Sequence, residues 1–390
     1  MRTIFTRKRD RLIVLPAIGS QFIATTSLFL MPVLINNLEV KAGLSGRAAG
    51  SLLSMELVVS AFTTLFLSAY SRSHSARRWA LFGGLLTIAG TALTLVSPSL
   101  LMLFATRLIA GVGAGIVGAE ATSVLARGVE REKLIAIVTI ASIVNAAIWL
   151  AVLPYMVDKL GYRGPYVCLL LIGLGGTYLL RRLPSLARRS ISDQQAAVNS
   201  PFNSTGVFVV VAIFLTQLGQ GAFWSLEETF GGRAGFSSHA IGVWLSAATL
   251  LLLLGAVITA WTSNRFGRFA SLFLLIAVNA ISILLISTIT VHWVFIAANA
   301  LQSITNLYSV ICQLGLAASM DRTGRVVAAS TSLVTLGNGL GPSLSANLGA
   351  AFGASSVGVL VLAFNLVALV LYSAIKLRDA KQLPVPVSLP

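Results

Sequence analysis

The stretch that decides the fold is TRLIAGVGAGIVGAE, residues 106–120, which holds one arginine and one glutamate inside an apolar run. An arginine in hydrocarbon costs roughly 2.5 to 3.5 kcal/mol on insertion scales, so it persists only where it faces a partner or a wet cavity. Gly111, Gly115 and Gly118 lie on the arginine's side of a helix, where missing side chains let a neighbouring helix approach closely. We therefore expect Arg107 to be a functional charge on a closely packed face.

The whole chain is apolar: of its 390 residues 56% are hydrophobic and only 10% are charged, and the mean hydropathy is +0.88. This composition indicates a polytopic, all-α membrane protein. The charges fall in clusters, and the intervals between them are long enough, as helices, to span roughly 30 Å of hydrocarbon. We expect twelve transmembrane helices, at 12–36, 48–70, 79–96, 100–123, 134–156, 164–180, 206–230, 240–262, 269–289, 293–317, 326–348 and 355–375.

The net charge of +16 is distributed unevenly among the connections. The two termini and the even-numbered connections hold 22 of the 28 Lys and Arg residues, and the odd-numbered connections hold five. By the positive-inside rule this asymmetry places both termini in the cytoplasm, with the chain in the plasma (inner) membrane of the cell. The lipid bilayer accounts for the basic charge, so we expect no nucleic-acid partner.

The chain divides into two related halves. A basic connection at 71–78 has a counterpart at 264–268, and Arg107 is followed 192 positions later by another polar intramembrane residue, Asn299. This spacing predicts a duplication of six plus six helices. The expected units are an N-terminal six-helix bundle over 1–182, a cytoplasmic linker over 183–205, and a C-terminal six-helix bundle with a short cytoplasmic tail over 206–390.

These features resemble the major facilitator superfamily over nearly the whole chain. The fourth segment matches the family pattern Arg-x-x-x-Gly-x-Gly-x-Gly through Arg107, Gly111, Gly113 and Gly115. The resemblance implies two six-helix bundles that give alternating access to a central site. It also implies a packing or gating role for these three glycines.

The family's signature loop, Gly-x-x-x-Asp-Arg-x-Gly-Arg-Arg, occurs here in two altered copies. The connection after 48–70 keeps only Ser71, Arg72, Arg77 and Arg78, without the Asp and the glycines. The connection after 240–262 is closer to the pattern and reads Asn264, Arg265, Gly267 and Arg268 at the matching positions. The resemblance implies that these basic residues and Gly267 take part in gating.

Drug/proton antiporters of this family usually carry Gly-x-x-x-Gly-Pro in the fifth helix. Segment 134–156 lacks that signature. A similar run, Gly337-x-Gly339-x-Gly341-Pro342, occurs in segment 326–348, where we expect Gly341 and Pro342 to serve close helix packing. We interpret this run as an indication of export.

Polar side chains recur at helical spacing inside several apolar segments, where lipid tolerates them poorly. They are Gln21, Asn145, Trp149, Gln217, Gln220, Trp224, Asn299, Gln302, Asn306 and Asn338. Two interpretations stay open. One is interhelical hydrogen bonding, worth about 0.6 kcal/mol a pair on average. The other is the lining of a substrate cavity, which we favour for segments 206–230 and 293–317 taken together.

Glu56 is an acidic residue well inside an apolar segment. From the helical rise, Glu56 lies roughly 12 Å and Arg107 roughly 10 Å below the outer boundary, so the two side chains can meet. Burial favours the neutral form of a carboxyl group and a nearby guanidinium favours the ionised form. A pair that forms in one conformation and parts in another would therefore couple transport to protons, and a permanent structural ion pair is the alternative.

Three further glutamates occur near the ends of segments. Glu120 is near the cytoplasmic end of segment 100–123, within reach of the connection that holds Arg77 and Arg78, and we expect it to act in a gate or as a topology clamp. Glu227 and Glu228 end segment 206–230 at the outer mouth. We expect them to be solvated there, with an entry funnel for cations as the alternative.

The residues indicate secondary transport. We find no nucleophile and base in register, no metal-ligand spacing and no P-loop, so we expect neither an enzyme, a metal, a cofactor nor an ATP-driven pump. The first interpretation is a monomeric carrier that exports a small neutral, amphipathic or anionic organic solute in exchange for protons. Proton-coupled uptake of a small organic acid or metabolite, and a membrane sensor without enzymatic activity, are the alternatives.

Overall fold

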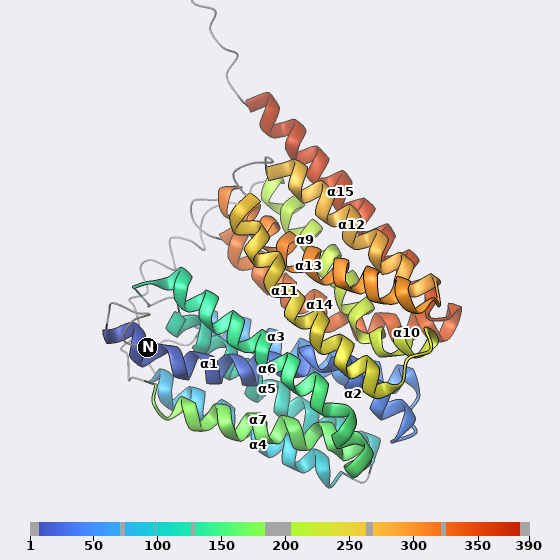
Figure 1. Ribbon diagram of the computed structural model, residues 1–390. Helices are drawn as coiled ribbons and strands as arrows, with labels where there is room; N and C mark the ends of the chain where they lie inside the picture. The colour runs from blue at the N-terminus through green and yellow to red at the C-terminus, as the bar shows by residue number, and fades with distance from the viewer. Residues whose placement is uncertain are drawn as a thin grey trace, which may run out of the picture.

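The computed structural model describes residues 8–70, 75–97, 99–125, 129–183, 204–262, 268–320 and 325–382, and every regular element in these ranges is helical (Figure 1). The first half contains α1 (Lys8–Phe29), α2 (Met31–Val40), α3 (Gly46–Tyr70), α4 (Ala76–Leu95), α5 (Leu100–Leu125), α6 (Arg131–Leu160), the 3₁₀ turn η1 (Gly161–Arg163) and α7 (Gly164–Leu180). The second half contains α9 (Ser204–Ser225), α10 (Glu227–Arg233), α11 (Ser238–Thr262), α12 (Arg268–Thr288), α13 (His292–Met320), α14 (Arg325–Phe352) and α15 (Ser355–Gln382).

The long helices lie where the hydropathy pattern predicts them. Among the described residues twelve helices have 17 or more residues, and each overlaps one of the expected segments. Ten stretches are long and apolar enough to cross a membrane, one of which, Arg131–Leu180, covers both α6 and α7. The chain is thus an all-α, multi-pass integral membrane protein.

The first expected segment, 12–36, is divided into two helices, which the hydropathy pattern does not predict. α1 ends at Phe29 and α2 begins at Met31. Pro32 has no N–H, so it cannot donate the helical hydrogen bond to the carbonyl oxygen of Leu28. The indole Nε1 of Trp224 in α9 donates to that oxygen instead, at 3.0 Å. The second half therefore supplies a hydrogen bond that the first half cannot make.

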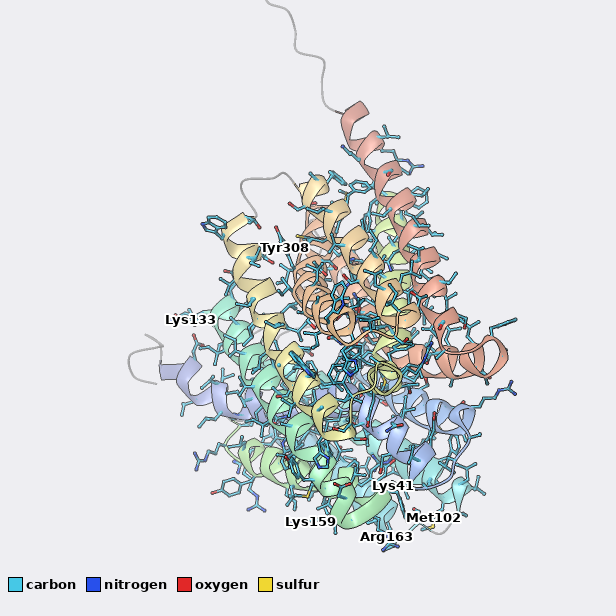
Figure 2. All side chains as sticks on the ribbon, turned by 45° about the vertical axis from the view of Figure 1, so that its right-hand side comes forward. Lys41, Met102, Lys133, Lys159, Arg163 and Tyr308 are labelled. Carbon is cyan, nitrogen blue, oxygen red and sulfur yellow. The ribbon has the colours of Figure 1, made fainter. Side chains whose placement is uncertain are left out.

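The helices form two groups. Figure 1 shows α1, α4, α5 and α7 packed together at the lower left, and α9, α12, α13 and α15 together at the upper right. The first group also includes α2, α3 and α6, and the second also includes α10, α11 and α14. The main contacts between the two groups are those of α3 with α14 and of α6 with α11, and α2 also touches α9 and α10. Figure 2 places Lys41, Lys159 and Arg163 together at one end of the molecule, with Lys133 well away from them.

One hydrophobic cluster crosses between the two groups at the end that contains α2 and α10, which we call the closed end. It includes Leu57 of α3, Leu150 and Leu153 of α6, and Ile241 and Leu245 of α11. Towards the opposite end the clusters stay within one half: one joins the start of α1 to the end of α5, and another joins the start of α9 to the end of α15. Packed side chains thus join the halves at the closed end.

Candidate functional site

Arg107 and Glu56 meet in the interior of the first half, as their expected depths indicate. The Arg107 side chain is 0% exposed, and its Nη1 lies 3.5 Å from Oε2 of Glu56. The other carboxylate oxygen, Oε1, accepts a hydrogen bond of 2.9 Å from the hydroxyl of Ser27 in α1. The ion pair and its hydroxyl neighbour are therefore contributed by α1, α3 and α5. We call this group the Glu56–Arg107 centre.

Two further residues hold the guanidinium, and the sequence did not single them out. Thr94 of α4 accepts hydrogen bonds from Nε and Nη2 of Arg107, at 3.1 and 2.8 Å. The ring of buried Tyr166 in α7 has its centroid 5.1 Å from the guanidinium carbon, in cation–π geometry. Threonine and tyrosine are common in apolar helices, so only the packing of α4 and α7 against α5 reveals these contacts.

The glycine face of α5 brings Glu56 to Arg107. A methyl group on Gly111 would lie 2.5 Å from the backbone oxygen of Glu56, and one on Gly115 would lie 2.5 Å from that of Ser60. Gly113 faces the other way, where a methyl group would lie 2.5 Å from the backbone nitrogen of Thr87 in α4. The predicted close approach of a neighbouring helix is confirmed, and that helix is α3.

A small cavity lies beside the carboxylate. Its volume is about 20 Å³, and its lining combines apolar side chains with the polar groups of Glu56, Thr26, Ser27, Thr87 and Thr91. A cavity needs about 10–15 Å³ to hold one water molecule, and a water needs two to four polar partners. The cavity meets both conditions, so a single water fits next to the carboxyl group.

In the second half the polar stripes of α9 meet those of α13 and α14. The side-chain amide of Asn338 donates to Oε1 of Gln217 at 2.9 Å, and that of Gln302 donates to Oε1 of Gln220 at 3.0 Å. Gln217, Gln220 and Gln302 are buried, each at most 7% exposed. The stripes thus face the protein interior and are hydrogen-bonded to each other in this conformation. A role in lining a solute path stays a prediction.

The other expected cavity residues lie towards the first half or are only half-buried. Asn145 of α6 donates to the hydroxyl of Thr26 in α1 at 3.2 Å, and Trp149 packs partly buried against the cluster at the closed end. Gln21 and Asn306 are half-buried.

The residues expected to act in gating or helix packing differ in their surroundings, and some of them lie outside the described part of the chain. Glu120 is buried near Ala17, Ser20 and Ala80, whereas Arg77 and Arg78 are exposed at the start of α4. Arg265, Gly267 and the side chain of Arg268 lie outside the described residues. In α14, Gly341 packs against the backbone of Ala222 in α9, and a methyl group on Gly50 would lie 2.6 Å from the backbone oxygen of Pro342.

The expectation that Glu227 and Glu228 are solvated is wrong. Both lie in the short helix α10, and they are 0% and 7% exposed. The helix is broken at Leu226, between α9 and α10, and the two carboxyl groups that follow contact Asn299 of α13 and Asn36 of α2. Glu227 is hydrogen-bonded to Asn299, and Glu228 to Asn36.

The two halves of the chain match the same family of known proteins. Residues 17–211 and residues 209–389 each match the family described as the Major Facilitator Superfamily. The chain belongs to this superfamily. No curated protein matches it with significant similarity. Membership of the superfamily supports secondary transport of small solutes across a membrane as the general activity of the chain, rather than enzymatic catalysis.

Solved structures of other superfamily transporters share the fold. A bacterial homolog of the human lysosomal transporter Spinster, in an inward-facing and unoccupied conformation, is 12% identical with a TM-score of 0.77, covering 97% of this chain and 99% of that one. A POT family transporter in complex with a thioalcohol-conjugated peptide is 13% identical with a TM-score of 0.72, covering 95% and 96%. A mutant form of the nucleoside transporter NupG is 13% identical with a TM-score of 0.68, covering 94% and 99%. At these identities the likeness shows the fold alone.

Proposed function

We propose that this chain exports a small organic solute in exchange for protons, by alternating access of two six-helix bundles over 1–182 and 206–390 that a cytoplasmic linker over 183–205 joins. In this proposal the twelve long helices all cross the plasma (inner) membrane of the cell, both termini are cytoplasmic, and the transporter works as a monomer. The uneven distribution of Lys and Arg supports this orientation.

The observation that carries proton coupling is the buried contact between Arg107 and Glu56. When the carboxyl group is ionised, it is balanced by the guanidinium and by the hydroxyl of Ser27. When it takes up a proton, the attraction to Arg107 weakens, but the guanidinium keeps its two hydrogen bonds to Thr94 and its contact with the ring of Tyr166. The arginine is therefore supported in both protonation states, which allows the proton to come and go.

The solute path in this proposal runs between the halves, past the polar stripes of α9, α13 and α14. In the present conformation a direct hydrogen bond joins Gln217 to Asn338, and another joins Gln220 to Gln302. A solute with its own donors and acceptors can replace these amide contacts at little cost. The path is lined by amides and aromatic groups, which suits a neutral, amphipathic or anionic organic molecule.

Inverted membrane vesicles test the proposal. The vesicles are acidified inside, loaded with a pH-sensitive dye, and given a panel of organic solutes. An exported solute should release protons from the lumen of wild-type vesicles and not from vesicles that carry Glu56→Gln. Solutes that instead enter right-side-out vesicles together with protons would assign proton-coupled uptake. The absence of any solute-dependent proton flux in both orientations would contradict the proposal.

A further inference from the structure

The closed end buries two adjacent carboxyl groups that the Glu56–Arg107 centre does not involve. Glu227 and Glu228 begin α10 and are 0% and 7% exposed. Both lie outside the ten candidate membrane spans. Within the described ranges neither forms a salt bridge with a lysine or an arginine. A buried carboxylate without a cation is costly, and burial then favours the protonated form.

The contact between Glu227 and Asn299 leaves two buried oxygens without a donor. The amide Nδ2 of Asn299 donates to Oε1 of Glu227. The two remaining oxygens of this pair, Oε2 of Glu227 and Oδ1 of Asn299, are buried and have no hydrogen-bond partner in the described part of the chain. If the carboxyl group is ionised, both are acceptors and cannot serve each other. A proton on Glu227 supplies the missing donor, and acid and amide can then satisfy one another.

Glu228 makes a similar contact across the two halves. The amide Nδ2 of Asn36 in α2 donates to Oε1 of Glu228 at 2.8 Å. Oε2 of Glu228 is buried without a partner in the described ranges. Because α2 belongs to the first half and α10 to the second, this hydrogen bond breaks whenever the closed end opens.

The other titratable groups around α10 do not neutralise the two carboxylates. They are Glu39 on α2, Lys41 just after it, Arg233 on α10 itself, His239 on α11 and His292 on α13, and α9 carries no charged residue. Arg233 donates to the backbone oxygen of Ser287 and to the hydroxyl of Ser355. His239 pairs with Asp158 of α6 at 3.2 Å. Arg233 and His239 are thus engaged with partners other than Glu227 and Glu228.

We propose that Glu227 and Glu228 form a second proton-binding site, which is loaded when the closed end forms and emptied when that end opens to water. The site differs in place from the Glu56–Arg107 centre, because it lies at the contact between the halves and not inside one of them. The proposal rests on the alternating access proposed above, since the halves must part at this end.

The direction of the pH effect follows from the burial. Burial raises the pKa of Glu227 to about 8 and that of Glu228 to about 7, from an ordinary value of 4.5. At a pH between the ordinary pKa and the raised pKa of each group, the closed state binds more protons than an open state with solvated carboxyl groups. Rising pH therefore disfavours closure. The dependence begins above the ordinary carboxyl pKa and ends once the pH passes about 8. Within this window each group changes the closed-to-open ratio by up to about tenfold per pH unit.

Distances across the closed end measure this ratio without any solute. Spin labels are placed on cysteines at Lys41 and Ser238, in a background with Cys168→Ala and Cys312→Ala, and the protein is held in lipid nanodiscs at pH 5 to 9. For the wild type we expect the short-distance population to fall as the pH rises. The double variant Glu227→Gln/Glu228→Gln should stay closed at every pH, because glutamine mimics the protonated carboxyl group.

A control variant tests the specificity of the pH response, and infrared spectra detect the protonated carboxyl groups directly. Glu132→Gln removes an exposed carboxyl group of α6 and should leave the pH response unchanged. Infrared difference spectra between low and high pH should show the C=O stretch of protonated carboxyl groups in the wild type, diminished in Glu227→Gln and in Glu228→Gln. A closed population that does not change with pH in the wild type, or a double variant that keeps the wild-type response, would overturn the proposal. Because solute and Glu56 are not involved, a failure of the proposed export activity alone would leave these results unchanged.

Discussion

Gly111 of α5 lies directly against the backbone oxygen of Glu56, at a distance that leaves no room for a methyl group between them. The carboxylate reaches Arg107 because α3 and α5 approach to backbone contact one helical turn away from the arginine. The absence of a side chain at one position thus sets the length of an ion pair at another.

We expect Gly111→Ala to lengthen the Glu56–Arg107 contact. A methyl group 2.5 Å from the backbone oxygen of Glu56 must push α3 outward, and overpacking of this kind typically costs about 1–3 kcal/mol. The loss should be measured as a lower unfolding temperature and reduced gradient-driven transport. Gly175→Ala in α7 is the matched control, because a methyl group there meets nothing within 4 Å. Equal behaviour of the two variants would show that the glycine face does not position Glu56.

Glu56→Gln should abolish gradient-driven transport while leaving substrate binding or energy-independent exchange partly intact, because the permanently neutral side chain mimics the protonated state. Arg107→Ala should lose more, since it leaves a buried carboxylate unpaired, which is typically destabilising by about 3–5 kcal/mol. Counterflow and gradient-driven transport in the same vesicles separate the two effects. If Glu56→Gln still moves solute against its gradient at the wild-type rate, another group carries the coupled proton.

Tyr166 should act through its ring and not through its hydroxyl. The hydroxyl is buried without a partner among the described residues, whereas the ring faces the guanidinium of Arg107. Tyr166→Phe should therefore keep stability and transport, and Tyr166→Leu should lose about 2 kcal/mol of desolvated cation–π interaction. Thermal unfolding of the two variants is the measurement. A hydroxyl role would appear as a loss in the phenylalanine variant that equals the loss in the leucine variant.

Cysteines at Gln220 and Gln302 should report the opening of the solute path. Both positions are buried and paired in this conformation, so we expect hydrophilic thiol reagents to react only as the halves part, and substrate to slow the reaction. Leu274→Cys on the apolar surface of α12, 64% exposed, is the lipid-side control. Labelling at Leu274 that matches labelling at Gln220 would mean that the polar stripes line no path.

Reporter fusions at Ser190 and Pro390 test the orientation. Both positions lie outside the described residues, Ser190 in the expected linker and Pro390 in the expected tail, and the distribution of basic residues assigns both to the cytoplasm. Each fusion should therefore read cytoplasmic. A signal from the opposite side of the membrane at either position would contradict the proposed topology of twelve spans.

The positions of the helices could be predicted from the sequence because hydrocarbon excludes charge, so charged clusters mark the ends of each span. The Arg107–Glu56 contact could also be predicted, since two lone charges at similar depth in lipid stabilise each other. The break at Pro32 was not predicted, although proline in an apolar run is a usable signal.

The surroundings of Glu227 and Glu228 could not be predicted from residue type. Acidic residues at the end of an apolar segment are normally solvated, and nothing local indicates that the helix breaks at Leu226. Their partners, Asn36 and Asn299, are 192 and 72 residues away along the chain. Only the tertiary packing of α2, α10 and α13 brings these groups together, as it also brings Thr94 and Tyr166 to Arg107.

The break between α1 and α2 makes the equilibrium between the closed and open states depend on water activity. Because Pro32 leaves the carbonyl oxygen of Leu28 without a helical donor, the indole of Trp224 satisfies it only while the closed end is formed. Once the halves part, a water molecule must take over, since an unpaired buried carbonyl is costly. Opening at this end therefore consumes water, and osmolytes that lower water activity should favour the closed end even at constant pH and constant substrate.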